Sequence, residues 1–202
     1  MEVFNVTIRD KNSGNIKSMS FPVEKSKFDS AMKADNFSEN LEFILQKCKA
    51  IPEINGAMFT LNASFEEVNF LANRIAEIGE DSTQMCAYRA LMSEPPDNIC
   101  EAINRTYGLE TVPVYPCENV EEYGEIVLDN DFLEELNEIP YELYDLLDKE
   151  KVGLRMQEKE GGMFIDGYYV IPSEYEPVLA YDGIVLPDIN EENTEEMEIE
   201  ML

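Results

Sequence analysis

The sequence predicts an α+β protein, built as an elongated chain of small subdomains. Three observations point to this class: strand-like runs flank a polar turn in residues 1–21, a helix with a capping motif starts at Ser64, and Asp166-Gly167 separates two β-rich runs. Apolar residues make up 44% of the 202 residues, which favours a folded chain over an acidic disordered one. The expected subdomains are a charge-neutral α/β unit at 1–60, a helical unit at 61–108, an acidic α/β unit with a hairpin at 109–187, and an acidic tail at 188–202.

The first sixty residues are expected to form a small mixed unit. Apolar residues on both sides of the polar turn 12–15 predict a pair of strands. Helices are expected at about 23–34 and 37–49, the second because the apolar residues of Leu41–Leu45 follow helical spacing.

The middle of the chain carries the clearest helix signal. Ser64 is followed three residues later by Glu67, the pattern of a capping box, and an apolar stripe then runs to Ile78 before Gly79 ends it. Two further helices and a short strand are expected after it, at 82–92, 96–106 and 111–115.

The net charge of −28 is unevenly distributed along the chain. Residues 1–60 carry eight acids and eight bases, so the whole net charge lies in residues 61–202. From Thr106 to Asp148 there are thirteen acids and no lysine or arginine. Like charges repel one another and destabilise a compact state. Two interpretations follow: a generically acidic, very soluble protein, or a negative surface that meets a positive partner.

The acids of this segment follow helical spacing, with apolar residues on the opposite side. Residues 118–129 are expected to form one helix. The same spacing is repeated in the residues that follow position 131, and Pro140 is expected to start another helix. We call the predicted surface the acidic face; it comprises Glu118, Glu121, Glu122, Glu125, Asp129, Asp131, Glu134, Glu135, Glu138, Glu142, Asp145 and Asp148.

The C-terminal part is expected to contain a hairpin and one more strand. The hairpin turns at Asp166-Gly167, and the further strand is expected within Val178–Leu186. Residues 188–202 are rich in glutamate and are expected to form a mobile acidic tail.

Several functional classes have little support in the sequence. There is no histidine, and the four cysteines contain no C-x-x-C pair, so zinc sites and histidine-based catalysis are disfavoured and free thiols are expected. Asp129-Asn130-Asp131 begins like a calcium loop, but the sixth residue is Glu134 instead of glycine. No nucleotide-binding glycine motif, signal peptide or membrane span is evident, so no cofactor is expected and a cytoplasmic location is the default.

A strongly acidic surface would repel nucleic acid and attract the proteins that bind it. Duplex DNA carries about one charge per 1.7 Å, so 28 charges match roughly 14 base pairs. The acidic face is therefore expected to bind a DNA-binding protein with a basic groove, with no direct contact to nucleic acid or membrane.

The order of elements resembles that of ArdA-type antirestriction proteins, which are carried by plasmids, conjugative transposons and phages. The resemblance is diffuse and covers most of residues 1–171. Its strongest part is Leu133–Pro140, continuing through Tyr141-Glu142-Leu143 to Tyr144 and Asp148, which is similar to the family's antirestriction motif. The chain departs from the family at 152–155, where it reads Val-Gly-Leu-Arg.

The resemblance implies a non-enzymatic, often dimeric protein that mimics bent B-form DNA and inhibits type I restriction–modification enzymes. Within the motif, Leu136, Leu143 and Leu147 either form a dimer interface or belong to the core. Three alternatives stay open: a mimic directed at another DNA-binding target such as a CRISPR nuclease, a carboxylate-based enzyme, and a metal-binding protein.

Overall fold

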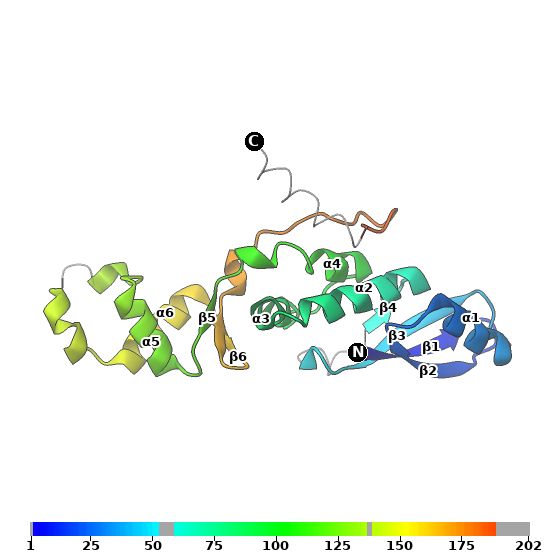
Figure 1. The fold of residues 1–202 in the computed structure, drawn as a ribbon, viewed down its shortest axis with the longest axis horizontal. Helices are drawn as coiled ribbons and strands as arrows, with labels where there is room; N and C mark the ends of the chain where they lie inside the picture. The colour runs from blue at the N-terminus through cyan, green and yellow to red at the C-terminus, as the bar shows by residue number, and fades with distance from the viewer. Residues whose placement is uncertain (1, 53–58, 137–138, 189–202) are drawn as a thin grey trace. The chain divides into compact units, whose positions relative to one another are not determined.

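The computed structural model describes residues 2–52, 59–136 and 139–188 and confirms the α+β class (Figure 1). Contacts divide the chain into two compact units. Unit 1 comprises Met1–Glu80, Pro95–Tyr107 and Pro177–Leu202, and unit 2 comprises Asp81–Glu94 and Gly108–Glu176. The chain therefore passes between the units four times. No helix in the described ranges has the length and apolar character needed to cross a membrane.

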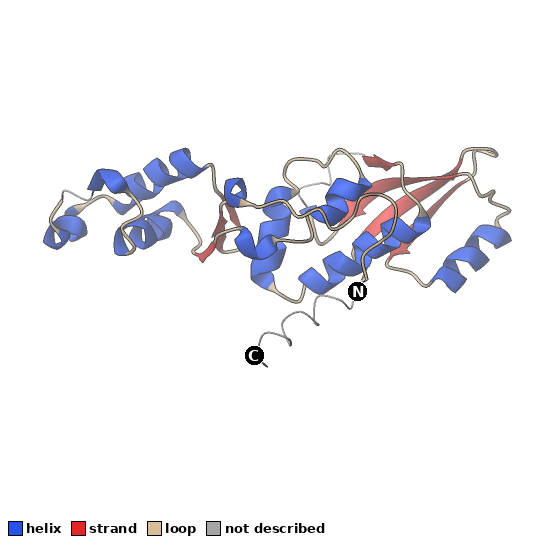
Figure 2. Cartoon of the chain, turned by 90° about the horizontal axis from the view of Figure 1, so that it is seen from above, coloured by secondary structure: helices blue, strands red, loops and turns tan. Residues whose placement is uncertain are grey.

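Unit 1 contains a four-stranded antiparallel sheet, drawn in red in Figure 2. Its strand order is β2-β1-β3-β4. The predicted strand pair is confirmed, because β1 and β2 run antiparallel with Phe4 opposite Phe21. The strands are β1 (Phe4–Asp10), β2 (Ile16–Phe21), β3 (Leu41–Cys48) and β4 (Phe59–Leu61).

The helix predicted at 37–49 is wrong, because this segment forms strand β3. Phe43 and Leu45 are buried while Ile44 between them is less so, which is the alternation of a strand with one covered face. Phe43 lies opposite Ile8 of β1 in the sheet. Pairing with a distant strand thus overrode the local spacing.

Helix α1 (Lys25–Ala34) contributes to an aromatic core with this sheet. Its Phe28 ring lies 6.2 Å from the Phe43 ring and 4.2 Å from that of Phe65, the first residue of α2. Phe21 completes the cluster, 5.9 Å from Phe65. The contacts connect the first strands to the helical part of unit 1.

The predicted capping box at the start of α2 (Phe65–Ile78) is confirmed. The Glu67 backbone N–H donates to the Ser64 side chain, and the Glu67 carboxylate accepts from the Ser64 backbone N–H at 2.7 Å. These bonds satisfy amide groups that have no partner inside the helix.

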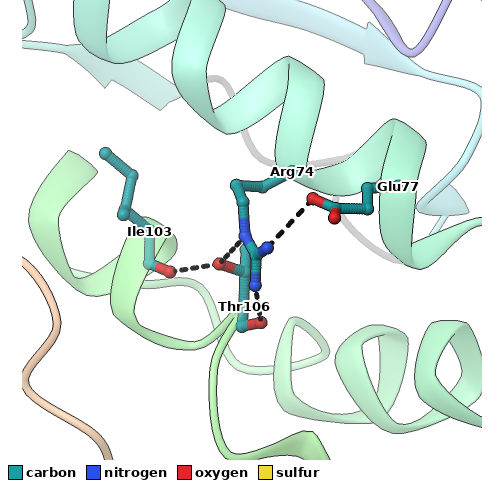
Figure 3. A network of polar contacts seen from close by, with 4 residues as sticks. All are labelled: Arg74, Glu77, Ile103 and Thr106. Carbon is teal, nitrogen blue, oxygen red and sulfur yellow. Dashed lines mark hydrogen bonds and ion pairs between the residues drawn. The ribbon is translucent and has the colours of Figure 1, made fainter. Parts of the chain in front are cut away.

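A buried arginine joins α2 to the end of α4 (Ile99–Asn104), as Figure 3 shows. Arg74 donates to the backbone oxygen of Thr106 at 3.2 Å and to the carboxylate of Glu77 at 2.9 Å. Its guanidinium also lies 4.3 Å from the ring centroid of Tyr107. The buried charge is therefore held by hydrogen bonds, an ion pair and an aromatic ring.

The segment after Pro177 returns to unit 1 as an irregular strap, so the strand predicted within Val178–Leu186 is wrong. Tyr181 is buried, and its backbone N–H and C=O both bond the Asn104 side chain, at 2.7 and 2.9 Å. Its hydroxyl donates to Glu67 at 2.9 Å, and burial together with that carboxylate raises the pKa of Tyr181 to about 12. The Asn104 side-chain amide thus satisfies the backbone groups of Tyr181 that a neighbouring strand would bond in a sheet.

Unit 2 combines a three-stranded antiparallel sheet, of order β5-β7-β6, with three α-helices in its described residues. The hairpin at Asp166-Gly167 is confirmed, and both residues have the positive φ angles, 47° and 84°, of a tight two-residue turn. The elements are α3 (Ser82–Leu91), β5 (Val114–Pro116), α5 (Val120–Asp129), α6 (Lys149–Glu160), β6 (Met163–Ile165) and β7 (Tyr168–Val170).

The helices predicted at 131–138 and after Pro140 are wrong in type, because short 3-10 helices stand there, at Glu134–Leu136 and Tyr141–Leu146. Asp131 has a φ of 54°, a left-handed conformation that breaks continuity with α5. Pro140 is extended, with a ψ of 135°, which separates the two turns. The two short pieces cannot carry one continuous helical stripe.

Helices α5 and α6 pack against each other through two glycines. A Cβ added at Gly124 would lie 1.9 Å from the Lys149 carbonyl oxygen, and one at Gly153 would lie 2.1 Å from that of Val120. Neither position has room for a side chain, so the two backbones are in direct contact.

A half-buried acid, Glu160, lies beside the core tyrosines of unit 2. The Tyr123 ring lies 3.7 Å from that of Tyr169, and its hydroxyl donates to Glu160 at 2.6 Å. Burial raises the pKa of the Glu160 carboxyl, and the Tyr123 hydrogen bond opposes that effect only in part. The charged form of this acid is therefore disfavoured in the folded state.

Candidate functional site

Helix α5 presents its acids to solvent and its apolar residues to the core, as predicted. Asn119 caps the helix, since its side chain accepts from the backbone N–H groups of Glu121 and Glu122 at 3.1 and 3.0 Å. The Glu122 carboxylate turns back to accept from the backbone N–H of Glu118 at 2.8 Å. Both acids of the first turn also lie where the helix dipole favours negative charge.

The exposed acids continue beyond α5 onto the 3-10 segments and the start of α6. Of the twelve residues of the acidic face, Glu138 lies outside the described residues. The other eleven are all exposed: Glu118, Glu121, Glu122, Glu125, Asp129, Asp131, Glu134, Glu135, Glu142, Asp145 and Asp148.

Three of these eleven acids form ion pairs, each with a base of α6. Glu125 contacts Lys149 at 2.7 Å, Asp148 contacts Lys151 at 2.9 Å, and Glu135 contacts Arg155 at 3.3 Å. Asp131 accepts a hydrogen bond from the Tyr144 hydroxyl at 3.0 Å. Within the described residues most of the acidic face has no neutralising base, so it keeps a strong negative potential.

The three leucines predicted as interface or core have different surroundings. Leu136 and Leu147 are half-buried against the core cluster of unit 2, which includes Tyr144 and Leu133. Leu143 is 44% exposed. The two half-buried leucines thus contribute to the core, and of the three only Leu143 offers a free apolar side chain.

A pocket of about 320 Å³ opens beside α5 within the acidic face. We call it the α5 pocket. Four carboxylates line it, together with two tyrosines, a leucine and one lysine: Glu125, Asp129, Glu142, Asp145, Tyr141, Tyr144, Leu128 and Lys149.

The charge of the first strands and α1 in unit 1 is organised differently. Its bases lie beside its acids, as in the pairs Arg9–Glu42 at 3.2 Å and Lys25–Asp29 at 3.1 Å. Further pairs of this kind are Lys27–Glu24 and Lys49–Glu2. The one buried acid of β1, Asp10, accepts hydrogen bonds from the Ser38 backbone and side chain, which hold the pKa of its carboxyl well below its usual range.

Unit 1 also contains a larger groove, with a volume of about 620 Å³. Phe28 and Phe65 contribute to its lining, and Lys25 lies over both rings at 5.5 and 4.7 Å from their centroids. The same ammonium contacts Asp29 and Glu66, so the groove has mixed charge and its Lys25 side chain is already paired.

The described residues contain no group of three or more acids or cysteines arranged to hold a metal ion. Asp129 and Asp131, the start of the calcium-like sequence, lie at the end of α5 and in the turn after it. None of the four cysteines, all of them described, forms a disulfide; Cys48, Cys86 and Cys117 are buried and Cys100 is half-buried.

Sequence reasoning missed the residues that give the acidic face its shape. Helix α6 was not predicted, because its sequence is mostly polar, and with it the bases Lys149 and Arg155 were overlooked as partners of the face. Tyr141, which is 70% exposed at the α5 pocket, was noticed only as part of a motif. An exposed aromatic residue within an acidic run was the available signal.

No family model matches the sequence, and no curated protein matches it either.

Proposed function

We propose that this protein is an acidic mimic of B-form DNA, which inhibits a type I restriction–modification enzyme by occupying its DNA-binding groove. The observation that carries the proposal is the acidic face. Its eleven described acids are all exposed, and only three have an ion pair within the described residues. A groove that binds phosphates is lined with cations and would attract such a surface.

The sequence resemblance to ArdA-type antirestriction proteins supports the choice of target. Its strongest part, Leu133–Pro140 with the residues up to Asp148, lies within the acidic face. The 3-10 turns there hold Tyr144 and Leu133 in the core while Glu134 and Glu142 stay exposed. The motif therefore has both a packing role and a place on the charged surface.

A cleavage assay with a type I enzyme on unmodified DNA tests the proposal. The variant Glu118→Gln/Glu121→Gln/Glu134→Gln removes three exposed charges without touching an ion pair or the α5 pocket. If each contact contributes about 0.5 kcal/mol, the concentration for half-inhibition should rise about tenfold. Raising the salt concentration should weaken inhibition by the unaltered protein, since exposed charges are screened beyond about 8–10 Å.

The matched control changes the same amount of charge on unit 1. Glu39→Gln/Glu80→Gln/Asp97→Asn also raises the net charge from −28 to −25, and it alters only exposed residues that take part in none of the ion pairs described above. It should shift half-inhibition less than about twofold. Absence of inhibition by the unaltered protein at low salt, or equal weakening by both variants, would contradict the proposal.

A further inference from the structure

The α5 pocket differs from the rest of the acidic face because it is concave and partly aromatic. Glu125 and Asp129 from α5 and Glu142 and Asp145 from the 3-10 helix Tyr141–Leu146 contribute its carboxylates. Acids that project from separate elements into one hollow add their potentials there, and the low-dielectric walls strengthen the effect.

A cation already occupies part of this pocket. The Lys149 ammonium lies 2.7 Å from a carboxylate oxygen of Glu125. That hydrogen bond, with the charges of Glu125, Asp129 and Asp145, raises the pKa of the Lys149 ammonium. One ammonium against four carboxylates leaves a net charge of about −3, so the pocket can accept a second cation.

The aromatic wall suggests which kind of cation fits. The Tyr141 ring lies 5.3 Å from that of Tyr144, and Tyr141 is 70% exposed whereas Tyr144 is 8% exposed. The Tyr144 ring is fixed by the hydrogen bond from its hydroxyl to Asp131, so the exposed Tyr141 ring packs against a ring that is held in place. A planar guanidinium stacks on such a ring while donating to nearby carboxylates, which a compact ammonium cannot do equally well.

A metal ion fits less well. The described residues contain no set of three acids arranged to hold one, although four carboxylates line the pocket. Carboxylates spaced around a hollow suit a larger cation with several N–H donors.

We propose that the α5 pocket is a receptor for one arginine side chain of the protein whose basic groove the acidic face enters. This proposal rests on the proposed function, because a DNA-binding groove supplies the arginine. The guanidinium stacks on Tyr141 and donates to Glu142 and Asp145, while Lys149 stays on Glu125. The acidic face thereby gains a specific contact beyond its general charge.

The test uses a fluorescent reporter at the mouth of the pocket. The chain has no tryptophan, so Tyr141→Trp introduces a single one and keeps an aromatic ring there. This variant is titrated with acetylated tri-arginine and with tri-citrulline, a neutral peptide of nearly the same shape. Tri-arginine should give a saturable change in tryptophan emission, and tri-citrulline should give none. Equal responses, or equal binding of tri-lysine and tri-arginine, would overturn the assignment.

Matched pairs of substitutions in the reporter background separate the pocket from overall charge. Glu142→Gln/Asp145→Asn and Glu134→Gln/Glu158→Gln raise the net charge equally, but only the first pair lines the pocket. The first should weaken tri-arginine binding about tenfold and the second less than about twofold. Equal losses of affinity in the two pairs would show that the peptide binds through the overall charge alone, and would overturn the proposal.

Removing the positive charge of Lys149 should change the affinity for tri-arginine in the opposite direction. Lys149→Gln takes a positive charge out of the pocket and frees Glu125, so tri-arginine should bind about threefold to fivefold more tightly. An unchanged or lower affinity, with an unchanged circular dichroism spectrum, would count against the pocket.

The peptide titration requires no restriction enzyme, so the two proposals can fail separately. If the protein inhibits a type I enzyme but shows no specific binding of tri-arginine, only the proposal for the α5 pocket is overturned. Specific peptide binding without inhibition of any type I enzyme overturns the proposed target, and the pocket stands.

Discussion

Replacing Gly153 with alanine should push apart the two helices on which the acidic face is built. The added Cβ would lie 2.1 Å from the Val120 carbonyl oxygen and 3.0 Å from the Gly124 nitrogen, both backbone atoms. A carbon–oxygen contact needs about 3.3 Å, so α5 and α6 must separate by roughly 1 Å. No change of rotamer can relieve the clash, because the obstacle is the backbone.

The expected loss of stability follows from two opposing effects. Alanine in place of glycine favours a helix by about 1 kcal/mol, whereas overpacking a close contact costs about 1–3 kcal/mol and sometimes more. A clash with backbone belongs at the upper end of that range. The net change should be a destabilisation of about 1–2 kcal/mol.

Urea unfolding followed by far-UV circular dichroism measures this change, with a midpoint about 0.5–1 M lower for Gly153→Ala. Glu158→Ala, at an exposed position of the same helix, is the control and should shift the free energy of unfolding by less than about 0.5 kcal/mol. The double variant Gly124→Ala/Gly153→Ala should lose less than the sum of the two, since one separation relieves both clashes. A stabilised Gly153→Ala protein would refute the close contact.

Two further predictions concern the interior of each unit. Glu160 has a raised pKa in the folded state, so its protonation stabilises the fold below the ordinary value of 4.5, and this contribution is lost as pH rises through the folded pKa. Relative to the unaltered protein, Glu160→Gln should therefore lose more free energy of unfolding at pH 4.5 than at pH 7, whereas the control Glu158→Gln should not. Urea unfolding at both pH values measures this. Identical pH dependence of stability in Glu160→Gln and the unaltered protein would contradict the prediction. In unit 1, Asn104→Ala removes both hydrogen bonds to the Tyr181 backbone and should speed chymotryptic cleavage after Tyr181; an unchanged rate would show that other contacts hold the strap.

The sequence predicted those elements whose signal is local. The capping box at Ser64 and the turn at Asp166-Gly167 depend on a few adjacent residues, and both are confirmed. The apolar side of α5 was also correct, because Tyr123 and Val127 are buried. In each case a short stretch of chain contains all the chemistry that the structure uses.

The errors lie where distant residues decide the structure. Leu41–Cys48 has the spacing of a helix, but pairing with β1 makes it a strand. The strap around Tyr181 is held by hydrogen bonds to Asn104, 77 residues earlier, and to Glu67, and no local sequence pattern predicts these contacts. For the candidate site, the identity and exposure of the acids were readable from the sequence, but the α5 pocket depends on 3-10 geometry between Asp131 and Leu147 and was not.

The alternation of the chain between the two units has a consequence for its synthesis. Residues from three separate stretches make up unit 1, and the last of them begins at Pro177. While the ribosome is still making unit 2, Asn104 and Glu67 lack their hydrogen-bond partner, because Tyr181 has not yet been added to the chain. Neither unit is one unbroken stretch of chain, and the last stretch of unit 1 begins only after the final residue of unit 2, Glu176. A nascent chain therefore completes unit 1 only after all of unit 2 has been synthesised, and the first sheet has to persist through that interval on its own aromatic core.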